Sequence, residues 1–416
     1  MNLPEQMFEL DGKQYPNPQA SDPRECGWML GSPPPADKRI SFESSNFRLF
    51  PRRRWSFSHM RELAPTVNVW RGPGAPSLFE RYDRSAEIDE MKSTDLEGRT
   101  RRFDEALIDT YADGMVVLHR GRIVYERYFG ALEPHLPHHC MSITKSYAGT
   151  LAASFLHEGE LEADRTISHY VPELRGSGWE DATVRQVMDM QVAVNYREDR
   201  IEAWSFASGS WPRPASYAGP ATLCDYMRTV KKEGVHGEVF DYKTVNTDVL
   251  AWVLARVTGR SFTQLLQERL WAPLGCEQDG YITVDPAGTP SAGGGLFATL
   301  RDVARFGELM RREGDWNGKQ LIPASVVSDI QRGDDPAKLA RAGYTLLPGY
   351  SYRSMWWISH NELGAFEGRG SYGQRMYIAP KAEMVAMRFS SHPLDRGAGD
   401  GNFMPHLLAL AGRLRE

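Results

Sequence analysis

The chain has little of what marks a disulfide-bonded, metal-binding or membrane-embedded protein. Its 416 residues include four cysteines, and no two of them form a C-x-x-C pair or match a zinc-ligand spacing. No apolar run reaches the roughly 18 residues of a membrane span, and the first residues lack the basic and apolar segments of a secretory signal. We therefore expect a cytoplasmic protein without a disulfide framework.

The chain also lacks an excess of basic charge. The formal net charge is −5, which favours neither a nucleic-acid partner nor a membrane surface. The run His138-His139-Cys140 resembles part of a metal site, but no matching ligands follow at a usable spacing. We expect no metal and no cofactor, and a small molecule as the partner. The oligomeric state stays open, with a homodimer as one option.

Composition and pattern divide the chain into three parts. Residues 1–100 are rich in proline, glycine and charge, and they are predicted to form an irregular N-terminal arm. The arginine run at 52–54 in this arm is either an anion site or, as we interpret it, a solvated surface segment. Residues 101–165 and 285–416 are expected to form an α/β core, and residues 166–284 a mainly helical insertion.

Hydrophobic periodicity predicts the elements of this core. Two β-hairpins are expected at residues 115–125 and 376–387. A long helix is expected over residues 142–157, with Gly159 at its C-terminal cap. Another helix is expected over residues 248–257, and capping signals predict helices that begin at Thr183, Ser261 and Thr299. The expected fold is α+β: an antiparallel sheet flanked by helices, with an inserted all-helical region.

The first chemical motif is Ser142-Ile143-Thr144-Lys145, at the start of the long helix. Residues three apart share one helix face, so the hydroxyl and the amine are neighbours. The first turn also places the serine at the positive end of the helix dipole. Lysine acts as a base only where burial or a nearby cation lowers its pKa. The other interpretation is an N-capping serine followed by a surface lysine.

Two further segments contribute to the pattern. Tyr242 stands in a polar loop just before a helix, where its phenol could relay a proton into a cleft; a buried tyrosine before a capped helix is the alternative. Residues 367–374 are glycine-rich and precede the last hairpin. An edge strand there could offer one N–H that pairs with that of Ser142 as an oxyanion hole. The alternative is an ordinary glycine-rich loop.

The order of these three elements resembles that of the class C β-lactamase-like serine hydrolases, which have the β-lactamase/penicillin-binding-protein-like fold. Several segments look more specifically like the 6-aminohexanoate-dimer hydrolases, which are similar in turn to family VIII carboxylesterases. The resemblance covers roughly residues 100 to 410. The segments that carry it are residues 141–146, 170–174, 189–191, 246–252 and 373–374.

The resemblance implies a role for each motif residue. Ser142 would be the nucleophile, Lys145 its base and Tyr242 the proton relay. The backbone N–H groups of Ser142 and Ser371 would form the oxyanion hole. The substrate-binding residues that the resemblance implies are Tyr196, Thr244, Gly370 and Tyr372.

The sequence also departs from the family patterns. Thr244 stands where β-lactamases have an asparagine, and Gly368-Arg369-Gly370 stands in place of K-T-G. Both changes argue against efficient β-lactam turnover. Arg200 replaces an aromatic residue expected in a nylon-oligomer pocket, and Gly293 replaces a polar one. These two changes argue against activity on nylon oligomers.

Together these features predict a serine hydrolase that cleaves a carboxylic ester or a small linear amide through an acyl-enzyme intermediate. The enzymatic alternatives are a D-amino-acid peptidase and a weak β-lactamase. The alternative from another class is a non-catalytic binding protein on the same fold.

Overall fold

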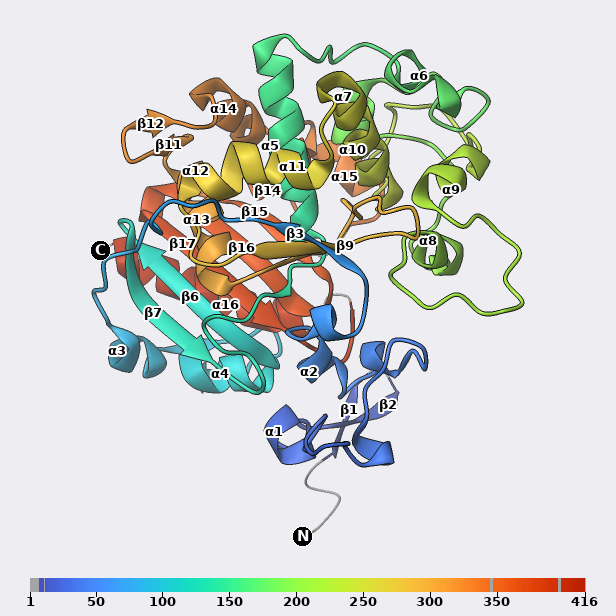
Figure 1. Cartoon of the computed structure of the whole chain (residues 1–416). Coiled ribbons are helices and arrows are strands. Elements are labelled where there is room, and N and C mark those ends of the chain that lie inside the picture. The colour runs from blue at the N-terminus through green and yellow to red at the C-terminus, as the bar shows by residue number, and fades with distance from the viewer. Residues whose placement is uncertain (1–6, 11, 345–346, 396–397, 416) are drawn as a thin grey trace.

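A seven-stranded antiparallel sheet lies at the centre of the computed structural model, which describes residues 7–10, 12–344, 347–395 and 398–415 (Figure 1). The two predicted hairpins are confirmed and are hydrogen-bonded to each other through β17 and β6. The sheet therefore joins the two ends of the core. Its strands, in spatial order, are β13 (Ser351–Arg353), β14 (Trp356–Ile358), β15 (Phe366–Gly370), β16 (Gln374–Ala379), β17 (Met384–Ser390), β6 (Ala112–His119) and β7 (Arg122–Tyr128).

Helices cover both faces of this sheet, because side chains along a strand alternate between the two faces. On one face Val116 and Leu118 pack in a core with α5 (Ile143–Glu158) and α13 (Leu300–Arg311). On the other face Met115 and Val117 pack with α4 (Phe103–Asp109) and α16 (Ala398–Arg415). The expected antiparallel sheet with flanking helices is confirmed as three layers.

Helix α5 runs between the sheet and the helical part of the molecule (Figure 1). Every residue from Ile143 to Phe155 is buried, so the helix has neighbours on all sides. It ends at Gly159, which has the left-handed φ of +76° that a C-terminal cap requires. The predicted helix and its cap are confirmed, and the helix starts directly after Ser142.

Residues 167–274 supply a group of helices above α5. The capping predictions at Thr183 and Ser261 in this region are confirmed. The capping prediction at Thr299, which precedes α13, is also confirmed. None of the helices in the described residues combines the length and apolar character that a membrane span requires. The helices of this region are α6 (Ile167–Tyr170), α7 (Val184–Met188), α8 (Glu202–Ala207), α9 (Leu223–Thr229), α10 (Val245–Thr258), α11 (Phe262–Leu266) and α12 (Ala272–Leu274). Two more, α14 (Ala324–Arg332) and α15 (Pro336–Arg341), precede β13.

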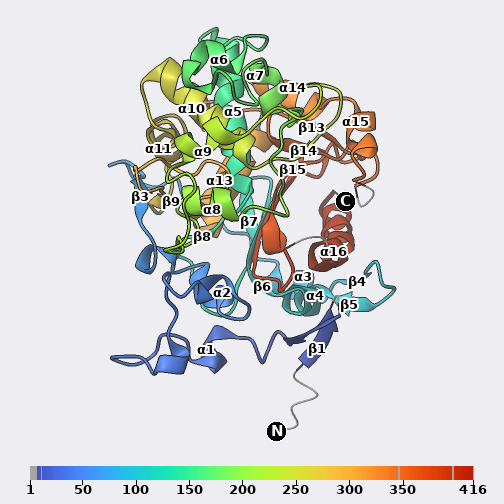
Figure 2. The same ribbon diagram turned by 90° about the vertical axis from the view of Figure 1, so that its right-hand side faces the viewer.

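The N-terminal arm is more regular than the sequence predicts. Its strand β3 (Thr66–Val69) is one edge of a second sheet, in the order β3, β9 (Gly280–Thr283), β10 (Leu296–Ala298) and β8 (His138–His139). Phe47, Trp55 and Met60 of the arm pack on Tyr281 and Phe297 of this sheet. Figure 2 shows the arm running beneath the core. The arm and the second sheet therefore share a small hydrophobic core that is separate from the two main ones.

The remaining elements of the arm are short. They are β1 (Met7–Leu10), β2 (Lys13–Pro16), α1 (Pro23–Cys26), α2 (Arg53–Ser56), α3 (Ser85–Asp89), β4 (Lys92–Thr94) and β5 (Thr100–Arg102), with 3-10 turns that include Asn46–Arg48.

The arginine run of the arm is not a solvated surface segment, so that interpretation is wrong. Arg53 and Arg54 are buried. The Arg54 guanidinium donates to Ser21 Oγ at 2.9 Å and lies 3.6 Å from the Asp113 carboxylate. The Arg53 guanidinium stacks over the Tyr372 ring at 4.0 Å from its centroid. These partners are distant in sequence, and a charge run shows nothing of them.

The packing of α5 gives a prediction about stability. A Cβ added at Gly149 would lie 2.0 Å from the carbonyl oxygen of Ser354, so Gly149→Ala is expected to lower the free energy of unfolding by about 1–3 kcal/mol. Urea unfolding would measure it. Gly412→Ala is the matched control, because Gly412 also lies in a helix and no atom lies within 4 Å of its added Cβ. Equal stabilities of the two variants would contradict the packing.

Candidate active site

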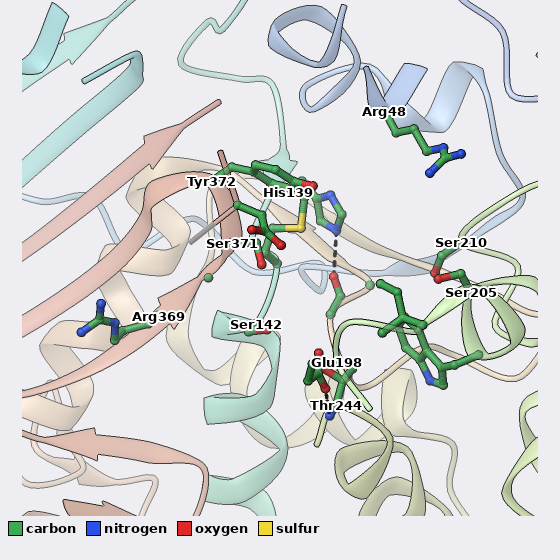
Figure 3. A pocket seen from close by; sticks show the side chains of 18 of the residues that line it. Arg48, His139, Ser142, Glu198, Ser205, Ser210, Thr244, Arg369, Ser371 and Tyr372 are labelled. Carbon is green, nitrogen blue, oxygen red and sulfur yellow. Dashed lines mark hydrogen bonds between the residues drawn. The ribbon is translucent and has the colours of Figure 1, made fainter. Parts of the chain in front are cut away.

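Ser142 and Lys145 are in hydrogen-bond contact at the start of α5. The Lys145 amine donates to Ser142 Oγ at 2.8 Å and to the Gly293 carbonyl at 2.5 Å. Lys145 is 1% exposed. Figure 3 shows Ser142 at the end of the helix, facing the cavity. The neighbourhood predicted from the three-residue spacing is present, and the surface-lysine alternative is wrong.

Burial sets the protonation of this lysine. Desolvation lowers the pKa of Lys145 to about 8, although the carboxylates of Glu198 and Asp248 act in the opposite direction. A lysine with this pKa is partly neutral near physiological pH, so it can accept a proton. The site therefore meets the condition that the motif alone leaves open.

Asp248 acts on Lys145 indirectly, through hydrogen bonds to the backbone of Gly293. Its carboxylate accepts the Gly293 N–H at 3.0 Å and the Trp204 indole N–H at 2.9 Å. The Gly293 carbonyl in turn accepts Lys145. Burial raises the pKa of Asp248 to about 6, against these hydrogen bonds. Asp248 thus fixes the acceptor that orients the amine.

Tyr242 lies beside the same amine. The Lys145 ammonium nitrogen is 5.0 Å from the centroid of the Tyr242 ring, within the range of a cation–π contact. The ring stacks on Trp357 at a centroid distance of 5.7 Å and meets Tyr352 edge-on. These two aromatic residues, from β14 and β13, hold the tyrosine loop against the start of α5.

Strand β15 reaches the helix start because it carries glycine. A Cβ on Gly370 would lie 2.8 Å from the Cys140 carbonyl and 2.9 Å from the Met141 Cβ. Gly368 is similarly close to α5, since its Cβ would lie 3.1 Å from Ser146 Oγ. Larger residues would push the strand away. Ser371 follows Gly370 directly and is therefore held near the helix start.

The backbone at Ser142 leaves its amide in front of the helix. The N–H groups of the next three residues, Ile143 to Lys145, donate to the carbonyls of residues 140–142. Helix N-termini leave amides of this kind available to an anion. Met141, just before Ser142, has a left-handed φ of +49°, which is unfavourable for a side chain of this size. The chain is thus bent sharply at the nucleophile position.

The start of α5, the loop that carries Tyr242 and the end of β15 meet at one cavity of about 690 Å³. This volume is within the range of small-molecule sites. Ser142, Tyr242 and Ser371 line it together with the four predicted substrate-binding residues Tyr196, Thr244, Gly370 and Tyr372. Their convergence is consistent with the residue set inferred from the resemblance. Arg200, which replaces an expected aromatic residue, is exposed to solvent.

Sequence reasoning missed several residues of the site. Glu198, whose carboxylate accepts the Thr244 N–H at 2.5 Å, lies in the same loop as Tyr196 but carries no distinguishing pattern. Asp248 reads as an ordinary residue of a helix. The arm was predicted only as an irregular segment, yet it supplies one wall of the cavity, with Phe42, Phe47, Arg48, Phe57, Met60 and Ala64.

The two histidines of the His138-His139-Cys140 run have structural partners. His138 Nε2 lies 3.1 Å from the Asp113 carboxylate. His139 Nε2 donates to the Gly294 carbonyl at 2.8 Å, and burial lowers the pKa of His139 to about 3. His139 is also part of the cavity wall. These contacts therefore fix the position of β8 (His138–His139), the strand that precedes Ser142.

An antiparallel sheet between helical layers, with a serine and a buried lysine on the central helix, defines the β-lactamase and penicillin-binding-protein class of serine hydrolases. Residues 101–410 match the Beta-lactamase family model, and the chain belongs to this family.

The chain is also similar to individual proteins, in sequence and in structure. The chain is 34% identical over 351 residues to a 6-aminohexanoate-dimer hydrolase of Paenarthrobacter ureafaciens, covering 82% of this chain and 86% of that protein. A solved structure from Bacillus anthracis, assigned as a 6-aminohexanoate-dimer hydrolase, is 33% identical with a TM-score of 0.84, covering 92% of this chain and 99% of that one. A family VIII carboxylesterase, at 16% identity, a TM-score of 0.55 and coverage of 75% and 95%, shares the fold.

The environment of Lys145 predicts its titration. In protein labelled with [ε-¹³C]lysine, the NMR signal that disappears in Lys145→Ala should titrate near pH 8 in the wild type. Asp248→Asn should move this pKa downward, because it removes an anion that favours the charged amine. Asp241→Asn is the control, because Asp241 pairs with Lys243 instead. A signal that titrates near 10.5 would contradict the buried environment.

Proposed function

We propose that the protein cleaves a carboxylic ester or a small linear amide through an acyl-enzyme on Ser142, with Lys145 as base and Tyr242 as proton relay. The observation that carries the proposal is the 2.8 Å contact between Ser142 Oγ and a buried amine whose pKa is lowered to about 8. A hydroxyl beside a neutral amine is an activated nucleophile.

In the acylation step, the Ser142 hydroxyl donates its proton to the neutral Lys145 amine as Oγ forms a bond to the substrate carbonyl carbon. The carbonyl oxygen becomes an oxyanion, which the amides of Ser142 and Ser371 stabilise. Collapse of this intermediate breaks the bond to the leaving alkoxide or amine. The Tyr242 phenol, whose ring centroid lies 5.0 Å from the Lys145 amine, would pass a proton to that leaving atom and regain one from the lysine.

In the deacylation step, water attacks the acyl carbon with the same groups in reversed roles. Its proton passes to the base, the bond from Ser142 Oγ to the carbonyl carbon breaks, and Oγ regains a proton as the carboxylic acid leaves. No group other than these side chains and water is required for the proton balance.

The walls of the cavity favour an extended substrate with an apolar stretch. Phe42, Phe47, Trp204, Trp211 and Trp357 line it. The names of the relatives support an ester or amide substrate: one is a 6-aminohexanoate-dimer hydrolase and another is a family VIII carboxylesterase. The cytoplasmic location and the homodimer remain predictions from the sequence.

The nucleophile is tested with a fluorophosphonate probe and a 4-nitrophenyl short-chain ester. We expect labelling and esterolysis in the wild type and neither in Ser142→Ala. Lys145→Ala should lower kcat/KM by about 10²–10⁴-fold, and Tyr242→Phe should also lower it, as expected for lost proton transfer. Absence of labelling would favour the non-catalytic binding protein. A parallel panel of linear amides, D-amino-acid peptides and β-lactams would distinguish the enzymatic alternatives.

The oxyanion hole is tested separately at β15. Ser371→Ala keeps the backbone amide, so kcat should change little. Gly370→Ala introduces a Cβ 2.8 Å from the Cys140 carbonyl and displaces the amide of Ser371, so kcat should fall by about 10²–10³-fold. Steady-state kinetics and circular dichroism would measure activity and folding. Equal kcat values in both variants would remove residue 371 from the oxyanion hole.

A further inference from the structure

One end of the cavity carries polar groups that the proposed reaction does not use. Arg48 lies on the 3-10 turn Asn46–Arg48 of the arm, Ser205 lies on α8, and Ser210 lies in the loop after α8. All three line the cavity. Figure 3 shows them on one side of Ser142, with Arg369 on the other. The arm and the helical region thus meet at this end.

Arg48 is held in place without neutralisation of its charge. Its guanidinium stacks on the Trp211 ring at 3.9 Å from the centroid. Across the described ranges of the chain, Arg48 forms no ion pair, and its buried Nε has no hydrogen-bond partner. Stacking occupies the face of a guanidinium and leaves its in-plane N–H donors for a planar acceptor. The side chain is therefore preorganised to bind an anion.

The two serines add hydroxyl donors. Ser205 is 1% exposed, and its Oγ has no hydrogen-bond partner among the described residues. A buried hydroxyl without a partner is unfavourable, and a ligand that accepts its proton would remove that cost. Ser210 Oγ accepts from Ser208 Oγ at 2.9 Å, so the proton of Ser210 remains available to a second acceptor. The hydroxyls and the guanidinium together form a set of donors with one positive charge.

We propose that Arg48, Ser205 and Ser210 form a subsite for a carboxylate of the substrate, so that the preferred ester or amide is an anionic one. This inference rests on the proposed function and adds a specificity site to it. One guanidinium matches a monoanion, and a planar carboxylate can accept two of its N–H groups side by side. Glu198, Asp199, Asp241 and Asp395 also line the cavity, and their repulsion of a dianion such as a phosphate would be about twice that of a monoanion.

The subsite makes the arm a determinant of specificity. The carbonyl carbon must reach Ser142, while the carboxylate is bound by Arg48 at the far end. The apolar part of the substrate would then cross the aromatic stretch that contains Phe47 and Trp204. A neutral ester of equal length keeps the apolar contacts but loses the ion pair.

Kinetics with matched esters test the subsite. One pair places the charge on the acyl side: mono-4-nitrophenyl adipate and its methyl ester. The other places it on the leaving group: 3-(4-butyryloxyphenyl)propanoate and its methyl ester. For at least one pair, the ratio of kcat/KM for the anion to that for the neutral ester should fall tenfold or more in Arg48→Gln and partly recover in Arg48→Lys. Unchanged ratios for both pairs in Arg48→Gln would overturn the proposal.

Arg52→Gln is the matched control. Arg52 is in the same arm, is half-buried and stacks on Trp28 at 4.9 Å, but it does not line the cavity. Its ratios should equal those of the wild type. If Arg52→Gln lowers the ratios as much as Arg48→Gln, the effect is the general charge of the arm and the subsite is wrong.

A binding measurement separates this proposal from the proposed function. Calorimetry on Ser142→Ala should show that the monoanion adipamate, the half-amide of adipic acid, binds more tightly than neutral adipamide, and that Arg48→Gln in the same background removes the difference. Equal affinities of Ser142→Ala for the two compounds would overturn the subsite even if the enzyme hydrolyses esters. If neither esters nor linear amides are hydrolysed, the proposed function fails, and the calorimetric difference still decides the role of Arg48.

Discussion

The site depends on a primary amine that is buried next to a serine hydroxyl. Lowering the pKa of Lys145 from 10.5 to about 8 means that the charged amine is disfavoured by about 3 kcal/mol relative to water. The fold tolerates this because the amine has two acceptors, Ser142 Oγ and the Gly293 carbonyl. The same desolvation that is unfavourable for stability makes the lysine a base near neutral pH.

Glycine permits the close approach that this arrangement requires. Gly293, Gly368 and Gly370 each lie where a Cβ would meet atoms of a neighbouring segment at 3.1 Å or less. Gly293 brings its carbonyl to the lysine, and the other two bring β15 to α5. The resemblance to nylon-oligomer hydrolases marks Gly293 as a departure. In this chain a larger residue there would lie 2.6 Å from the Thr244 side chain, so Gly293 and Thr244 are matched to each other.

Local patterns in the sequence were sufficient for the elements and for the contact between residues 142 and 145. The hairpins, α5 and its glycine cap follow from periodicity and capping, and helix geometry places residues i and i+3 together. The arm could not be predicted in this way, because its order comes from long-range partners. Arg54 is buried beside Asp113, and Arg53 stacks on Tyr372, more than three hundred positions away.

The same limit applies to the charges of the cavity. In the sequence, Gly368-Arg369-Gly370 stands in place of K-T-G, so the lysine is missing and Arg369 is the cation next to its position. In the structure, however, the Arg369 guanidinium lies 3.4 Å from the buried carboxylate of Glu367 in its own strand. Arg369 therefore already contacts a carboxylate, which it shares with Arg375 at 2.9 Å. Arg48, on the opposite side of Ser142, has no such carboxylate partner within the described residues. The proposed anion subsite therefore lies on the arm, a segment outside the residues that match the family model.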